Sequence, residues 1–111
     1  MITMEQLFTE VGNSIKAWAG EALKEAQDEH EALALLNEIV YEQVEFVAAP
    51  WRVSVNDLLN LALVTPELAT TPVTGASPED ALRENLKEFI HEYAVDMKDE
   101  IFDDWLLERG K

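Results

Sequence analysis

The chain has 111 residues and a formal net charge of −15, from 23 acidic and 8 basic side chains, and 48% of its residues are hydrophobic. This apolar content predicts a single globular domain over residues 1–111 and argues against a disordered acidic tail. The absence of cysteine excludes disulfides, thiolate zinc sites and cysteine nucleophiles. The surplus of negative charge predicts a basic partner, such as a nucleic-acid-binding protein. It disfavours direct binding to nucleic acid or to an anionic membrane.

The first residues do not form a basic segment followed by an apolar run, so we expect no signal peptide. No apolar stretch reaches the roughly 18 residues that would suggest a transmembrane helix. Both observations favour the cytoplasm as the location of the chain.

The first predicted element is a helix that begins after Thr3. The Thr3 hydroxyl and the Gln6 amide fit a capping box. Gly12 and Gly20 interrupt the helix and are interpreted as close-packing or kink positions. Steps of three and four place one apolar face on Leu7, Phe8, Val11, Ile15, Trp18, Ala22 and Leu23.

A second helix is predicted to begin at the N-cap Asp28, with Glu31 three positions later, and to end before Pro50. Its apolar face contains Leu33, Leu36, Ile39, Val40, Val44 and Val47. The valine-rich residues 51–55 are also compatible with an extended segment. Ser54 then caps a short third helix through Leu63, and Pro66 either closes that helix or starts one more turn.

Residues 70–77 are predicted to form a loop that ends in a strong helix start, with Ser77 as N-cap and Pro78 as the first helical residue. The helix that follows is predicted to run to about Glu108, with Gly110 just beyond its end. Its apolar face contains Leu82, Leu86, Phe89, Ile90, Tyr93, Met97, Ile101, Trp105 and Leu106. The predicted fold is therefore all-α, with two N-terminal helices, a short middle helix and a long acidic C-terminal helix.

Acidic side chains recur at four-residue steps in the three long helices. The longest row lies in the last helix, where Lys87 and Lys98 offset it only in part. Like charges four residues apart each cost a few tenths of a kcal/mol, so a helix selected only for stability would alternate them with lysine. The rows are Glu84, Glu88, Glu92, Asp96 and Glu100, which Asp103 and Asp104 extend, then Glu21, Glu25 and Glu29, and then Glu38, Glu42 and Glu45.

Two interpretations of these rows are open. They are the solvated outer faces of amphipathic helices in an acidic protein, or they imitate the phosphates of a nucleic acid and bind the basic groove of a DNA-binding protein. A partner-binding role for all three rows is our leading hypothesis. The alternative is a helical adaptor or assembly protein that binds its partner through an apolar groove, with acidity serving only solubility.

The chain resembles the phage DNA-mimic antirestriction proteins of the Ocr type. The resemblance lies in an acidic first helix, Asp28-Glu29-His30-Glu31 opening a second, Asn56-Asp57-Leu58-Leu59 in a short middle helix, a loop with Pro and Gly, and a long acidic last helix with Tyr93. It implies an all-helical homodimer without cofactors that inhibits a host defence protein by occupying its DNA-binding groove.

Signals for catalysis and metal binding are weak. Glu88 and His91 match the Glu-x-x-His unit of di-iron bundles, but such sites need two units, and His30 is expected at the surface. No nucleophile motif or phosphate loop is present, so we expect no enzyme activity. Trp51 beside Pro50 fits helix packing or a partner contact, and a homodimer seam is predicted at Trp51, Leu58 and Leu61.

Overall fold

The structure, a computed structural model, describes residues 2–69 and 77–110. In chain order the elements are α1 (Met4–Glu25), α2 (Glu29–Val47), α3 (Val55–Val64), the 3₁₀ turn η1 (Pro66–Ala69) and α4 (Pro78–Arg109). No strand occurs in these two ranges. The all-α fold with a long C-terminal helix is confirmed. Of the predicted loop, residues 70–76 lie outside the described residues.

The helix boundaries follow from side chains that satisfy free backbone groups. At α1, the Thr3 Oγ1 accepts from the Gln6 N–H at 3.1 Å, and the Gln6 Oε1 accepts from the Thr3 N–H at 3.0 Å. At α2, the Asp28 Oδ1 accepts from the Glu31 N–H at 2.7 Å. The sequence predicted all four caps, which are Thr3, Asp28, Ser54 and Ser77.

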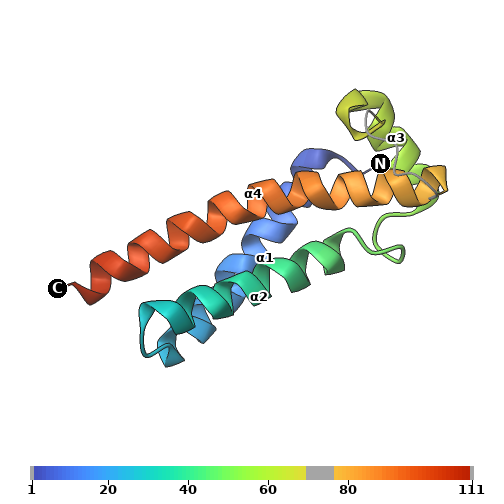
Figure 1. Cartoon of the computed structure of the whole chain (residues 1–111). Helices are drawn as coiled ribbons and strands as arrows, with labels where there is room; N and C mark the ends of the chain where they lie inside the picture. Colours follow the sequence, from blue (N-terminus) through green and yellow to red (C-terminus); the bar gives the residue numbers. More distant parts are fainter. Residues whose placement is uncertain (1, 70–76, 111) are drawn as a thin grey trace.

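The three long helices pack against one another, and α3 and η1 pack against α4. Figure 1 shows α1 and α2 as an antiparallel pair, with α4 running the length of the molecule and α3 at the end where α4 begins. The molecule is elongated, with extents of 49 × 29 × 22 Å. Its core contains Leu7, Val11 and Ile15 of α1, Val40, Val44 and Val47 of α2, Leu58 and Leu61 of α3, Leu68 of η1, and Leu86, Ile90 and Ala94 of α4.

The two glycines of α1 differ in role. Gly12 is buried, and a Cβ built there would lie 3.2 Å from the Met97 Cε and 3.4 Å from the Tyr93 hydroxyl, so α4 approaches α1 closely at this point. Phe8 stacks on Tyr93 in the same contact, with ring centroids 4.8 Å apart. A Cβ at Gly20 would meet nothing within 4 Å. The close-packing interpretation therefore applies to Gly12 and is wrong for Gly20.

Two further predictions are corrected. Trp18 is 60% exposed. The buried row of α1 advances in steps of four, which turn it by about 40° each. By Ala19 that row has rotated away from the side on which Trp18 lies. Residues 51–53 form turns and no extended segment, because the N–H groups of Arg52 and Val53 both donate to the Ala49 carbonyl at 2.9 Å.

Candidate partner-binding surface

The acidic row of α4 lies on the surface of the molecule. All seven of its side chains are exposed. Within the described residues, Glu84 accepts from the Lys87 Nζ at 3.4 Å, and the other six carboxylates form no ion pair or hydrogen bond. From residue 84 to residue 104 the row spans about 30 Å along the helix axis. The predicted row is therefore an exposed and largely unpaired strip of negative charge.

The basic side chains of α4 that could neutralise this strip point toward α2 instead. Lys87 binds Glu45 of α2 at 3.1 Å and is 22% exposed. The Lys98 Nζ donates to the Asn37 Oδ1 of α2 at 3.0 Å and also lies 3.6 Å from Asp99. The sequence had suggested that Lys87 and Lys98 offset the row. Their spacing of three helical turns was the signal that both lie on one side, facing a neighbouring helix.

Arg83 lies on the same side of α4 as Lys87 and Lys98, closer to the start of the helix. It is buried, and its Nη1 donates to the Ala48 carbonyl at the end of α2 at 2.8 Å. Its Nη2 lies 3.6 Å from the Glu79 carboxylate but has no hydrogen-bond partner among the described residues. Arg83, Lys87 and Lys98 thus stabilise the packing of α4 on α2 and leave the outer face of α4 acidic.

The row is not a straight line. Each step of four residues advances by about 40° beyond a full turn, so the carboxylates from Glu84 to Glu100 wind about 160° around α4. The winding is right-handed, like the helix itself. Glu84 lies in the groove with Tyr41 and Glu45 of α2, and the row winds away from α2 toward Glu100. The row therefore crosses the outer side of the molecule diagonally.

A groove between α2 and α4 connects the acidic rows of these two helices. Its volume is about 410 Å³, and its lining includes Tyr41 and Glu45 of α2 and Glu84, Glu88, His91 and Glu92 of α4. Tyr41 is 66% exposed. The Lys87 ammonium lies in the groove between Glu45 and Glu84. Burial lowers the pKa of Lys87, but the hydrogen bond that Lys87 donates to Glu45 and the charge of Glu84 outweigh it, so the pKa is raised above 10.5.

The shorter acidic rows are also at the surface. Glu21, Glu25 and Glu29 are exposed, and Glu21 pairs with Lys24 at 3.2 Å. Glu38 and Glu42 are exposed as well, and Glu45 is half-buried in the groove. All thirteen predicted carboxylates are thus accessible at least in part.

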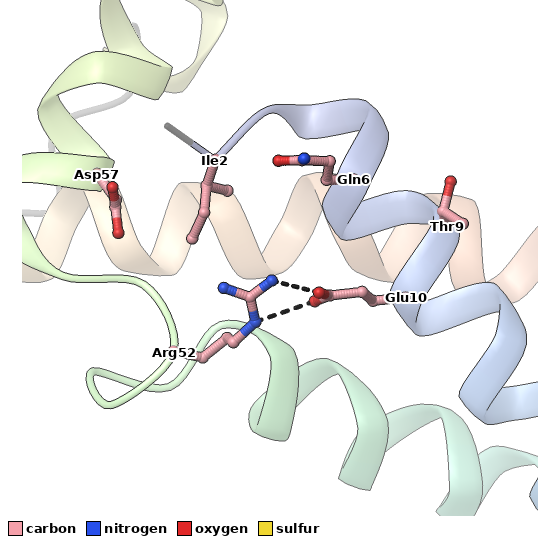
Figure 2. A pocket seen from close by; sticks show the side chains of 6 residues that line it. All are labelled: Ile2, Gln6, Thr9, Glu10, Arg52 and Asp57. Atoms are coloured by element: carbon pink, nitrogen blue, oxygen red, sulfur yellow. Dashed lines mark hydrogen bonds and ion pairs between the residues drawn. The ribbon is translucent and has the colours of Figure 1, made fainter.

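A charged pair connects α1 to the turn after α2. Arg52 donates from its Nε to the Glu10 Oε2 at 3.1 Å, and its Nη2 donates to the Glu10 Oε1. Figure 2 shows the pair in a pocket of about 480 Å³ that Asp57, Gln6, Thr9 and Ile2 also line. Both carboxylate oxygens of Glu10 are occupied, so the pocket presents a neutralised pair. The hydrogen bond to Glu10 raises the pKa of Arg52.

The predicted dimer seam needs correction. Leu58 and Leu61 are 1% and 0% exposed within the single chain, because they face the core beneath α3, and they are inaccessible to a second copy. Trp51 is 65% exposed and lies edge-on against Phe46, with ring centroids 4.6 Å apart. The exposed apolar residues of α3 are Val55, Leu59, Leu63 and Val64.

The two histidines are both exposed. His91 lies beside Glu88 and Glu92 in the groove between α2 and α4, and His30 lies in a pocket formed by the start of α2 and the end of α4. Among residues 2–69 and 77–110, no three His, Asp or Glu side chains are grouped so that they could hold a metal ion.

None of the described helices combines the length and the apolar character needed to cross a membrane. Comparison with protein-family models, with curated proteins and with solved structures gives no match for this chain.

Proposed function

We propose that this protein is an acidic DNA mimic that binds the nucleic-acid-binding groove of a host defence protein, such as a restriction enzyme, and thereby inhibits it. The proposal rests on one observation above all: the α4 row is exposed while the basic side chains Arg83, Lys87 and Lys98 face α2. A face kept acidic only for solubility has no need to direct its counter-charges inward.

The charge density of α4 is compatible with mimicry. Seven carboxylates over about 30 Å give one charge per roughly 4 Å, compared with one per roughly 3.4 Å along one DNA strand. The row also winds in the right-handed sense of a B-DNA strand. In the groove between α2 and α4, the exposed ring of Tyr41 lies with Glu88 and Glu92 of the row. A carboxylate and an aromatic face both favour an arginine or lysine side chain of the target.

The first experiment is capture of the target from a bacterial lysate, followed by titration of the binding constant against salt. Binding to a phosphate-reading groove should weaken steeply as salt rises, because the target's basic residues interact with carboxylates through screened charges. Replacing Glu88, Glu92 and Glu100 by Gln should weaken binding and flatten the salt dependence. The comparison variant carries Glu21→Gln, Glu25→Gln and Glu29→Gln, which make the same change of charge at the end of α1 and the start of α2.

The outcomes separate the candidate surfaces. Loss of affinity in the α4 variant alone identifies the α4 row as the binding surface. Equal losses in both variants indicate that the α4 row contributes no more to binding than Glu21, Glu25 and Glu29 do. Unchanged affinity and salt slope in the α4 variant would show that this row is not the recognition surface.

A second candidate is a helical adaptor that binds its partner through an apolar surface. The observation in its favour is the exposed pair of Phe46 and Trp51, which lines a pocket of about 430 Å³ with Val47, Asn13, Ser14 and the Glu10–Arg52 pair. Binding there should respond little to salt and should be lost in Trp51→Ala. The same target can therefore be tested against both proposals.

A further inference from the structure

Large aromatic side chains are exposed along the groove between α1 and α2. Phe46 and Trp51 are 56% and 65% exposed, and they line the pocket of about 430 Å³ to which α1 contributes Asn13 and Ser14. Trp18 is 60% exposed and follows Ser14 by four residues, so it lies one turn further along the same side of α1. Single exposed apolar residues are common, whereas several large rings along one groove are typical of a surface that a partner covers.

The polar groups of this pocket would not be left unpaired beneath a partner. Glu10 and Arg52, which also line the pocket, neutralise each other. The side chains of Asn13 and Ser14 form no hydrogen bond among the described residues, so their amide and hydroxyl groups are available to a bound molecule. Covering the pocket therefore buries apolar rings without burying an uncompensated charge.

Four carboxylates border the aromatic surface on the side away from the pocket. They follow Trp18 along α1 and precede Phe46 along α2 by one and two turns, and in an antiparallel pair these are the same direction (Figure 1). All four are exposed, and only Glu21 has an ion-pair partner among the described residues, which is Lys24 at 3.2 Å. The four are Glu21 and Glu25 of α1 and Glu38 and Glu42 of α2. The surface is thus aromatic at one end and negative at the other.

We propose that this surface binds a cationic amphipathic helix of another protein. Its apolar side chains would cover Trp18, Phe46 and Trp51, and its Lys or Arg side chains would meet the carboxylates beyond them. Charge complementarity selects this occupant, because an acidic segment, including a second copy of this chain with its net charge of −15, is repelled.

A helix suits the place because the groove is open on one side. Among the described elements, only α4 packs against both α1 and α2, so the side of this pair that faces away from α4 can accept a further helix. That helix would complete a four-helix arrangement, and its apolar stripe would lie in the groove. The inference deepens the second candidate function, on which the place of the site rests, by giving the chemistry of the partner. It requires neither the α4 row nor a DNA-binding target.

The probe is a synthetic helical peptide of about 18 residues, or five turns, made of leucine on one face and lysine on the other. At about 150 mM salt, calorimetry with the full chain should give one peptide per chain and a micromolar Kd. Trp51→Ala and Trp18→Ala should each raise this Kd by roughly 10-fold or more. The matched control is Tyr41→Ala, which removes an equally exposed ring on the α4 side of α2 and should leave the Kd unchanged.

Two further peptides separate charge from shape. A peptide with the same composition but scrambled leucines has the same charge and no apolar face, so it should bind at least about 10-fold more weakly. A peptide with glutamine in place of lysine keeps the apolar face and should bind about 3- to 10-fold more weakly, because each exposed ion pair contributes little. Equal binding of the lysine and glutamine peptides would overturn the cationic partner while leaving the apolar surface of the second candidate function intact.

Other results would overturn the proposal as a whole. They are the absence of binding to the amphipathic lysine peptide, equal binding of the scrambled peptide, and equal losses in Tyr41→Ala and Trp51→Ala. Loss of binding in the variant with Glu88→Gln, Glu92→Gln and Glu100→Gln, with none in Trp51→Ala, would place the peptide on the α4 row instead. A chain that dimerises without peptide and becomes monomeric in Trp51→Ala would show that a second copy covers the rings. None of these measurements uses a DNA-binding target, so they succeed or fail separately from DNA mimicry.

Discussion

Arg52 and Glu10, which are 42 positions apart in the chain, form a two-pronged contact that joins the turn after α2 to the first half of α1 (Figure 2). The two side chains are 29% and 40% exposed, so solvent screens their attraction. The contact therefore fixes the path of the chain between α2 and α3 more than it adds stability.

We expect a coupling energy of about 0.5–1 kcal/mol between Arg52 and Glu10, at the upper end for exposed pairs because the geometry is bidentate. A double-mutant cycle with Arg52→Gln and Glu10→Gln, measured by urea unfolding, gives this quantity directly. A coupling energy of zero would mean that the contact between Arg52 and Glu10 contributes nothing to stability.

Alanine substitutions at the two glycines of α1 should change the unfolding free energy by different amounts. Gly20→Ala should raise the unfolding free energy by about 1 kcal/mol, because the helix gains propensity and the new methyl group meets nothing. Gly12→Ala should raise the unfolding free energy by less, since the new Cβ must displace the end of the Met97 side chain. Gly12→Val should destabilise the protein, because its larger side chain forces α1 and α4 apart. Thermal unfolding of the three variants checks this order, and equal gains at both glycines would contradict the close approach at Gly12.

Arg83 should contribute far more to the stability of the fold than the neighbouring carboxylate of Glu79. Arg83→Ala removes the hydrogen bond to the buried Ala48 carbonyl and should cost about 2 kcal/mol. Glu79→Gln removes only the 3.6 Å ion pair with Arg83 and should change stability by less than about 0.5 kcal/mol. Chemical denaturation of both variants provides the comparison. Similar losses would show that the ion pair, and not the bond to Ala48, holds Arg83.

Removing charge from the α4 row should leave the fold intact. The variant with Glu88→Gln, Glu92→Gln and Glu100→Gln loses like-charge repulsion at four-residue spacing, which costs roughly 0.2–0.5 kcal/mol per pair. Its unfolding free energy should therefore rise slightly at low salt, and the gain should shrink as salt screens the wild-type repulsion. A marked loss of helical circular dichroism would mean that these side chains have a structural role.

The stability that Lys87 contributes should depend on pH at alkaline values. The pKa of Lys87 is raised in the folded chain. Its contribution is therefore fully present below the unfolded pKa of about 10.5 and is lost as the pH rises through the higher folded value. The difference in unfolding free energy between wild type and Lys87→Met, about 0.5–1 kcal/mol at neutral pH, should shrink above pH 10.5. A difference that stays constant through this range would show that the contacts with Glu45 and Glu84 contribute nothing.

Local sequence determined the helices of this protein. Thr3, Asp28, Ser54 and Ser77 place hydroxyl or carboxylate oxygens where the first free N–H groups need an acceptor, and this requirement is met within four residues of the chain. The same holds for Pro50, which stops α2, and for the four-residue spacing of the acids, which fixes their places along α4. These features needed no knowledge of neighbouring helices.

Only the tertiary structure decided which side of each helix is covered. A helical period identifies an apolar side but not how far a partner helix extends along it, so Trp18 is exposed although its spacing suggested burial. Both sides of α3 are apolar, and packing on α4 and η1 decided that Leu58 and Leu61 are buried while Leu59 and Leu63 are exposed. Likewise, the direction of Lys87 and Lys98 depends on α2 lying beside α4. This placement, which no local rule contains, leaves every carboxylate of the acidic row except Glu84 without an ion-pair partner among the described residues.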